Sequence, residues 1–295
     1  MPLVWTVASR SSLVASRAWR LPRTASRNLS SMRADAYLEP TEAPGAFSLV
    51  LNRPQAKNAI SMRLLAEIQQ CLDELRNDKS ARALIIRSSQ VGSFCAGADL
   101  AERRTMSQQQ VTAFLIDLRR AMSSLETLPV PTIAAIDGPA LGGGLELALA
   151  CDLRVAGPSA NKIGLPEVKL GIIPGAGGTQ RAARLLGLPK AKDLIFTGRM
   201  LNATEALEWG VVDYIAETPQ SAFDRALQLA KDMSGSAPLA LRAAKLAISR
   251  APEFTTIDSA LDFERQCYEP LLKSKDRVEA LEAFKEKRAP VFKGE

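Results

Sequence analysis

The sequence contains no histidine. This absence excludes the Ser-His-Asp and Cys-His nucleophile systems and removes the usual ligands of most zinc hydrolases. Cysteine is also scarce, and its four positions lie far apart, without the paired spacing of a zinc site or a disulfide scaffold: Cys71, Cys95, Cys151 and Cys267. We therefore expect buried thiols and no metal site, and acid or base chemistry must come from carboxylates, lysine, tyrosine or cysteine.

The first 34 residues lack acidic side chains, since the first one in the chain is Asp35. They hold six arginines and seven serines, a composition typical of a mitochondrial presequence. Apolar residues between the arginines permit an amphipathic basic helix but form no secretory or membrane-spanning run. We therefore predict a transit peptide at residues 1–34, a location in the mitochondrial matrix and no membrane association; a basic tail without targeting function is the alternative.

The net charge of +6 depends on this leader. Six of the 38 basic residues lie in it, and the rest of the chain has equal numbers of basic and acidic side chains. The body is therefore close to neutral, which argues against a polyanionic partner for it.

The body of the chain alternates strand and helix patterns. With 295 residues, 46% of them hydrophobic, it can bury a large core. Short apolar runs between turn residues predict buried strands at residues 47–51, 83–87 and 132–136. Apolar residues at helical spacing predict helices at residues 62–75 and 111–128. This alternation is typical of the α/β class.

The pattern changes after Lys190, where the only strand signal is at residues 211–215. Helical patterns cover the rest, at residues 223–233, 239–249, 257–272 and 277–288. We therefore predict an α/β core at residues 35–230 and a helical C-terminal region at residues 231–295.

A loop of small residues at 94–100 follows the predicted strand at 83–87. Small side chains let a ligand approach the backbone and leave N–H groups available to an anion or a carbonyl oxygen. A tight turn without a ligand is the alternative.

Three consecutive glycines, Gly142, Gly143 and Gly144, precede a helix predicted at residues 145–150. A helix N-terminus offers unpaired N–H donors and the positive end of the helix dipole, here without side chains in the way. This arrangement is typical of an oxyanion hole. The spacing fits neither a dinucleotide fingerprint nor a Walker loop.

Two glutamates are candidate catalytic groups. Glu146 has apolar neighbours on a helix that should be buried, where a carboxylate is costly unless it is paired or functional. Glu167 follows 21 residues later with a strand-like segment at 152–156 between them, so a fold can bring both into one cleft. A solvent-facing Glu146 and a simple loop carboxylate at Glu167 are the alternatives. Thr179, after a glycine-rich run, is expected to cap the next helix.

Five segments stand in the order typical of the crotonase, or enoyl-CoA hydratase and isomerase, family: residues 52–59, 96–99, 140–146, 166–167 and 173–180. On these segments the chain resembles that family from about Ala46 to Glu295. The resemblance implies an α/β fold, a spiral of ββα units with a helical C-terminal trimerisation region, assembled as a homotrimer or homohexamer.

The resemblance also implies roles for single residues. It places an oxyanion hole on the N–H groups of Ala98 and Gly143 and the two catalytic carboxylates on Glu146 and Glu167. It implies an acyl-CoA substrate and no separate cofactor, because coenzyme A is part of the substrate. The positions expected to contact the substrate are Lys57, Ala96, Gly97, Asp99, Leu100, Gly142, Pro166 and Gly175.

Hydration of an enoyl-CoA is the activity that the resemblance favours, because relatives that only move a double bond commonly keep one acid/base group at these two positions. An isomerase, decarboxylase or thioesterase, or an RNA-binding or scaffold protein without turnover, are the alternatives. Residues 159–164 look one residue longer than the same segment in many relatives, which leaves the loop geometry open.

Residues 128–138, 145–155 and 275–295 look like the subgroup of methylglutaconyl-CoA hydratases that bind AU-rich RNA, which points to leucine breakdown. RNA binding in that subgroup uses a lysine-rich helix that corresponds to residues 61–79. Here this segment has three basic and four acidic side chains, so phosphate binding has little electrostatic support. We therefore predict no RNA partner.

Overall fold

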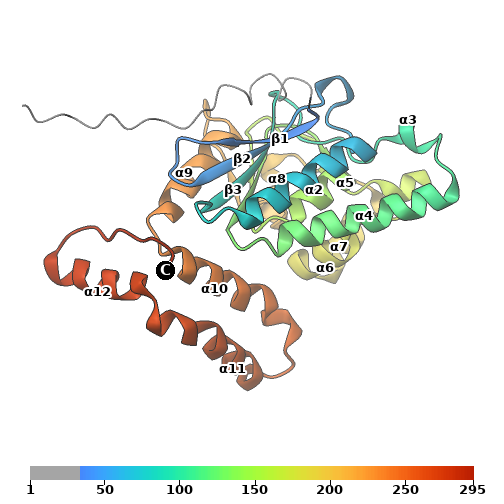
Figure 1. Ribbon diagram of the computed structural model, residues 1–295. Coiled ribbons are helices and arrows are strands. Elements are labelled where there is room, and N and C mark those ends of the chain that lie inside the picture. Colours follow the sequence, from blue (N-terminus) through green and yellow to red (C-terminus); the bar gives the residue numbers. More distant parts are fainter. Residues whose placement is uncertain (1–33) are drawn as a thin grey trace, which may run out of the picture. The chain divides into compact units, whose positions relative to one another are not determined.

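The computed structural model describes residues 34–295 (Figure 1). Residues 1–33 of the predicted transit peptide lie outside the described part. The strands are β1 (Ala36–Pro40), β2 (Ala46–Leu51), β3 (Ala83–Ser88), β4 (Thr132–Ile136), β5 (Ala140–Leu141), β6 (Leu153–Ala156), β7 (Ile163–Gly164) and β8 (Tyr214–Ile215). The α-helices are α2 (Met62–Asn77), α3 (Leu100–Arg103), α4 (Gln108–Glu126), α5 (Gly143–Leu149), α6 (Gly178–Leu186), α7 (Leu188–Thr197), α8 (Ala203–Trp209), α9 (Ala222–Ser234), α10 (Pro238–Arg250), α11 (Ile257–Tyr268) and α12 (Lys275–Glu286). Short 3₁₀ helices are η1 (Pro54–Ala56), η2 (Glu167–Leu170), η3 (Ala251–Glu253) and η4 (Glu269–Lys273).

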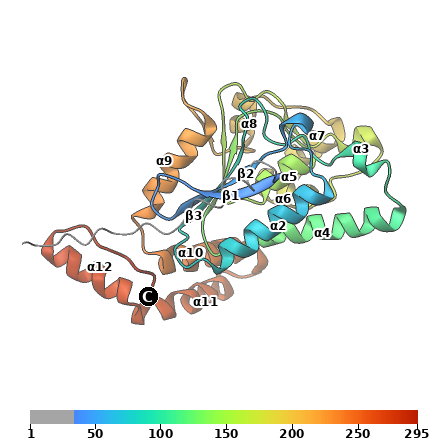
Figure 2. The ribbon, with the colours of Figure 1, turned by 45° about the horizontal axis from the view of Figure 1, so that its top comes forward.

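The main sheet has the strand order β1-β2-β3-β4-β6-β8. β1 pairs antiparallel with β2, and the other neighbours pair in parallel. Ile85, Ile133 and Val155 pack with α9, whereas Leu84 and Ile86 belong to the core shared with α2 and α4. Figure 2 shows α9 on one side of the sheet and α2 and α4 on the other. Because both faces are buried, the strands are continuous apolar runs in the sequence.

The two long helices of the core begin at side-chain caps. The Ser61 hydroxyl accepts a hydrogen bond from the Leu64 N–H at the start of α2. Ser107 and Gln110 form a reciprocal capping box at the start of α4. Each helix then buries one apolar stripe, and the two stripes face each other beneath the sheet.

A two-stranded sheet and isolated β-bridges connect the loops that follow the main strands. β5 pairs in parallel with β7, and single bridges join Ile60 to Ala98 and Cys95 to Ala140. The Leu141 N–H donates to the Cys95 carbonyl at 3.0 Å. These bonds hold the loop after β3 against the loop after β4, where the candidate site forms.

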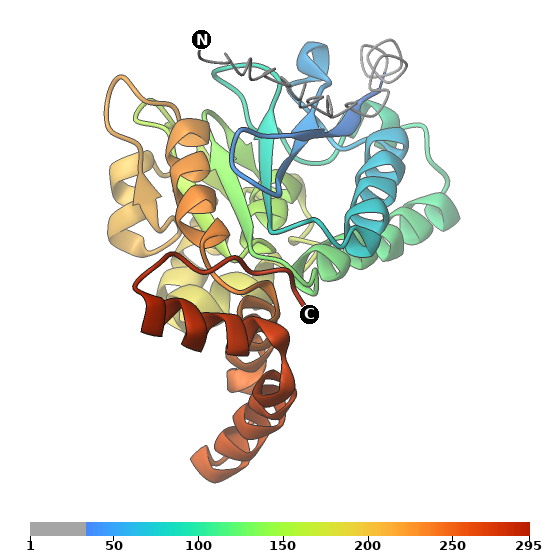
Figure 3. The ribbon, with the colours of Figure 1, turned by 60° about the vertical axis from the view of Figure 1, so that its left-hand side comes forward.

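The C-terminal helices α10, α11 and α12 lie together outside the layers of the main sheet (Figure 3). Lys245 ties α10 to the core, because its Nζ atom lies 2.8 Å from Asp152 Oδ2 and donates to the Val130 carbonyl at 2.9 Å. Large apolar side chains on these helices are exposed, among them Ile248 and Phe284. Within residues 34–295, no helix combines the length and the apolar character needed to cross a lipid bilayer.

The structure corrects some of the predicted elements. The strand expected at residues 211–215 is reduced to Tyr214–Ile215, because the N–H groups of Val211 and Val212 both donate to the Ala206 carbonyl and close the end of α8. The sequence pattern missed α8 itself and the edge strand β1. The division predicted at residue 230 falls inside α9 and stays a prediction.

Candidate active site

Two backbone N–H groups lie close together where the loop after β3 meets the start of α5. The bridge between Ile60 and Ala98 uses the Gly97 carbonyl and the Asp99 N–H, which leaves the Ala98 N–H out of this pairing. Gly143 is the first residue of α5, so its N–H has no acceptor within the helix. A Cβ atom added to Gly143 would lie only 3.6 Å from the Ala98 nitrogen. The two residues are therefore close neighbours, as the predicted oxyanion hole requires.

Gly97 permits this approach. Its φ of +94° is unfavourable for other residues, and a Cβ atom there would lie 2.7 Å from the Leu141 carbonyl oxygen and 3.4 Å from the Gly143 nitrogen. A side chain at this position would therefore separate the two donors.

Glu146 lies on α5 and is almost fully buried, with 2% of its surface exposed. Its Oε1 atom accepts hydrogen bonds from the Ala176 N–H at 2.7 Å and the Gly178 N–H at 2.8 Å. Burial raises the pKa of this carboxyl, whereas the two N–H donors and the nearby Arg181 charge oppose the rise. The loop before α6 thus supports the ionised form of a buried carboxylate.

Arg181 holds that loop in place. Its Nη1 atom donates to the Ala176 carbonyl at 2.9 Å, and its Nη2 atom lies 2.7 Å from Glu126 Oε2 on α4. The ion pair therefore connects α4 and α6 behind the N–H groups that bind Glu146.

Glu167 is the first residue of η2 and has 8% of its surface exposed. Its Oε2 atom is buried and has no hydrogen-bond partner in the described part of the chain. Burial, together with the negative charge of Glu146, raises the pKa of Glu167 to about 7, although its own backbone N–H opposes the rise. The two carboxyls thus differ, because Glu146 accepts N–H bonds from two residues of a distant loop, whereas the donor that acts on Glu167 is its own N–H.

Both glutamates and both N–H donors line one cavity of about 810 Å³. Six of the predicted substrate contacts also line it: Ala96, Gly97, Leu100, Gly142, Pro166 and Gly175. The structure therefore brings together residues that lie up to 79 positions apart, from Ala96 to Gly175.

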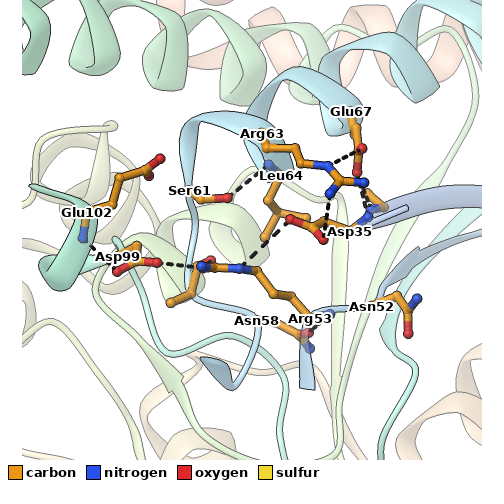
Figure 4. Close-up of polar contacts among 12 residues, drawn as sticks. Asp35, Asn52, Arg53, Asn58, Ser61, Arg63, Leu64, Glu67, Asp99 and Glu102 are labelled. Carbon is orange, nitrogen blue, oxygen red and sulfur yellow. Dashed lines mark hydrogen bonds and ion pairs between the residues drawn. The ribbon is translucent and has the colours of Figure 1, made fainter. Parts of the chain in front are cut away.

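Two predicted substrate contacts lie outside the cavity lining. Asp99 caps α3, where its Oδ1 atom accepts from the Ala101 and Glu102 N–H groups, and its Oδ2 atom lies 2.7 Å from Arg53 Nη1 (Figure 4). Lys57 is exposed, and its carbonyl accepts from the Ala96 N–H at 3.0 Å. Both residues shape the loop that carries the Ala98 N–H.

The cap predicted at Thr179 is wrong. α6 begins one residue earlier, with Gly177 at the N-cap position and no side-chain cap. The Gly178 N–H at this end donates to the Glu146 carboxylate instead. A side chain distant in sequence therefore accepts the bond that an N-cap side chain would otherwise accept.

The sequence pattern did not assign several lining residues to the site. Leu115 and Leu118 belong to the apolar pattern that predicts the helix at residues 111–128, whereas Ile172 and Ile173 lie in the loop after η2. Arg103 on α3 also lines the cavity. Its only signal in the sequence is a basic residue just after the loop of small residues.

The arrangement fits proton transfer beside a polarised carbonyl group. Two adjacent N–H donors can stabilise negative charge on a carbonyl oxygen, and two carboxyls with different proton affinities can exchange protons with a reacting group. Among residues 34–295, no group of three or more Cys, Asp or Glu side chains forms a metal site.

Comparisons with known proteins show the family of the chain. The family model for enoyl-CoA hydratase/isomerase matches residues 42–295. An enoyl-CoA isomerase/hydratase of Mycosarcoma maydis is 55% identical over 271 residues, which cover 88% of this chain and 97% of that protein. The mitochondrial methylglutaconyl-CoA hydratase of Homo sapiens is 48% identical over 257 residues, which cover 86% of this chain and 75% of that protein.

Among solved structures, the enoyl-CoA hydratase from Bacillus anthracis matches with a TM-score of 0.85 and 42% identity, and covers 88% of this chain and 100% of that one. This match confirms the predicted crotonase-type α/β fold with its helical C-terminal region. The chain belongs to the enoyl-CoA hydratase/isomerase family.

Proposed function

We propose that this protein is an enoyl-CoA hydratase, which adds water across the 2,3 double bond of an acyl-CoA thioester. The observation that carries the proposal is the pair of unlike carboxyls, Glu146 and Glu167, in one cavity with the N–H groups of Ala98 and Gly143. A hydratase needs one group to activate water, one to protonate carbon and one to stabilise the enolate. The cavity offers all three.

The chemistry follows from the proton affinities. Glu146, whose carboxylate accepts two backbone N–H bonds, takes a proton from water as its oxygen attacks C3. The thioester oxygen gains negative charge, which the N–H groups of Ala98 and Gly143 stabilise. Glu167, whose pKa is near 7, supplies the proton that C2 receives. The product is a 3-hydroxyacyl-CoA, with one molecule of water added.

The relatives guide the choice of substrate and location. The human relative is named a mitochondrial methylglutaconyl-CoA hydratase, and we extend both properties to this chain, as a matrix enzyme of leucine breakdown. The exposed apolar side chains of α10 to α12 suit assembly as a homotrimer or homohexamer. We propose that the enzyme uses no cofactor besides the coenzyme A of its substrate and has no RNA partner.

Isomerisation is the second candidate, because the Mycosarcoma maydis relative is named as both isomerase and hydratase. It differs in product: hydration of crotonyl-CoA gives 3-hydroxybutyryl-CoA, whereas isomerisation gives a shifted double bond.

The test compares wild type with Glu146→Gln and Glu167→Gln on crotonyl-CoA, methylglutaconyl-CoA and a medium-chain enoyl-CoA. An amide keeps the size of the side chain but cannot transfer the proton, so each variant should lose about 10²–10⁴-fold in kcat with KM little changed. Glu208→Gln, an exposed carboxylate on α8, is the control. Near-normal turnover in either active-site variant, or absence of a 3-hydroxyacyl product with wild type, would contradict the proposal.

A further inference from the structure

Among residues 34–295, one cation lies in the wall of the active-site cavity. The charged lining residues in this part of the chain are Arg103, Glu146 and Glu167, and the others are apolar side chains, prolines and glycines. The two glutamates transfer protons in the proposed reaction. The guanidinium of Arg103 takes no part in that proton transfer, and an uncharged hydrocarbon chain offers it no hydrogen-bond acceptor.

The backbone of α3 fixes where Arg103 lies. The Arg103 N–H donates to the Asp99 carbonyl at 2.9 Å, and the Asp99 carboxylate caps the first turn. The loop that supplies the Ala98 N–H therefore continues directly into the helix that carries Arg103. A substrate whose thioester oxygen binds that N–H lies in the same cavity as the guanidinium.

The carboxylates nearest to Arg103 in sequence are already engaged. Asp99 binds Arg53 and the N-terminus of α3. Glu102 accepts a hydrogen bond from the Met62 N–H at 2.9 Å. Within residues 34–295, the Arg103 guanidinium has no ion pair or side-chain hydrogen bond, and its recorded contact is the ring of Phe114, whose centroid lies 6.0 Å away.

The contact with Phe114 places the guanidinium beside α4. The ring is buried, and the next residue, Leu115, lines the cavity with Leu118 one turn further along. An acyl chain that fills this space displaces water from a half-buried cation. A hydrocarbon tail offers nothing in exchange, whereas a carboxylate forms a charge-assisted, bidentate pair.

We propose that Arg103 is a specificity residue that binds a carboxylate on the acyl chain of the substrate, so that the cavity selects coenzyme A thioesters of dicarboxylic acids over those of simple fatty acids. This inference rests on the proposed function for the orientation of the acyl chain. It adds a subsite that the two glutamates and the two N–H donors do not provide.

Equilibrium binding tests the subsite apart from catalysis. Glutaryl-CoA and pentanoyl-CoA have the same number of acyl carbons and the same coenzyme A, and neither has a double bond to hydrate. Isothermal titration calorimetry on the full chain gives Kd for each. We expect wild type to prefer glutaryl-CoA by about tenfold to a hundredfold, and Arg103→Met to abolish that preference.

Two further variants complete the design. Arg103→Lys keeps the charge but not the fork of donors, so it should retain part of the preference. Arg104→Met is the matched control, because Arg104 is the adjacent arginine, is exposed and does not line the cavity, so it should keep the full preference. Thermal unfolding of each variant shows whether it is folded.

The outcomes separate the explanations. Equal weakening of both ligands by Arg103→Met would mean that Arg103 serves coenzyme A or the fold, and the proposal would be overturned. A wild-type chain without a preference, or a preference that survives in Arg103→Met, would overturn it as well. Loss of preference in Arg103→Met supports the subsite even if wild type hydrates no enoyl-CoA, so failure of the proposed function is a distinct result.

Discussion

Replacing Glu167 with glutamine should stabilise the folded chain at alkaline pH while it removes a group needed for turnover. Burial raises the pKa of this carboxyl from 4.5 to about 7. At about 1.36 kcal/mol per unit, that rise of about 2.5 units sets an upper limit of about 3.4 kcal/mol. Solvent in the open cavity screens the charge, so we expect about 2 kcal/mol.

The sign of the effect follows from the proton balance. Below the unfolded pKa the Glu167 carboxyl is protonated in both states and costs nothing. As the pH rises toward 7 the unfolded chain ionises first, so the free energy of unfolding of wild type falls, and it levels off above the folded pKa. Glutamine does not titrate, so the free energy of unfolding of the variant does not include this decrease.

Urea unfolding of wild type and Glu167→Gln near pH 5 and near pH 8, at one protomer concentration, measures the difference. The stability advantage of the variant should grow by about 1–2 kcal/mol between the two conditions. Glu208→Gln, which changes an exposed carboxylate, should show no such growth. An advantage for Glu167→Gln that is the same at both pH values would refute the reasoning, because the carboxyl would then not be desolvated.

Three further predictions concern the same site. Because Glu167 must hold the proton that C2 receives in the proposed reaction, kcat/KM for hydration should fall as the pH rises above about 7 and Glu167 ionises; a flat profile would contradict this. Arg181→Met releases the Ala176 carbonyl and so loosens the N–H donors beside it, and steady-state kinetics should show kcat lowered roughly 10–100-fold with a small change in KM, partly restored in Arg181→Lys. Gly144→Ala puts a Cβ atom 2.2 Å from the Cys95 carbonyl oxygen, so thermal unfolding should show a loss of about 2–4 kcal/mol; an unchanged Tm would mean that the two loops can separate freely.

The sequence predicts best those elements whose burial leaves a local pattern. The run at residues 132–136 coincides with β4, because every residue in it is buried. Helix α8 has a capping box at Asn202 and Glu205, a local signal that apolar periodicity alone overlooks in so short a helix. The edge strand β1 buries only Ala36, and two-residue strands such as β5 arise from pairing with distant segments. These elements depend on contacts with residues distant in sequence, so a short stretch of sequence does not predict them.

The candidate site shows the same division. Motifs indicated Glu146 and Glu167, but not which carboxyl holds a proton near neutral pH. That difference comes from the Ala176 and Gly178 N–H groups, which lie 30 and 32 positions beyond Glu146. The assignment of acid and base therefore depends on contacts that only the folded chain provides.

The glycines around the site make room for both carboxylates as well as for backbone donors. A Cβ atom on Gly142 would lie 3.0 Å from Glu167 Oε1, and one on Gly178 would lie 3.0 Å from Glu146 Oε1. Both distances are shorter than side chains normally tolerate, so an added methyl group would push the carboxylate it meets. Gly142 also has a φ of +51°, so a substitution there adds backbone strain to the contact, whereas Gly178 lies within the first turn of α6. The glycine runs at residues 142–144 and 175–178 thus have a second physical reason: each carboxylate faces a glycine whose missing side chain leaves space for its oxygen atoms.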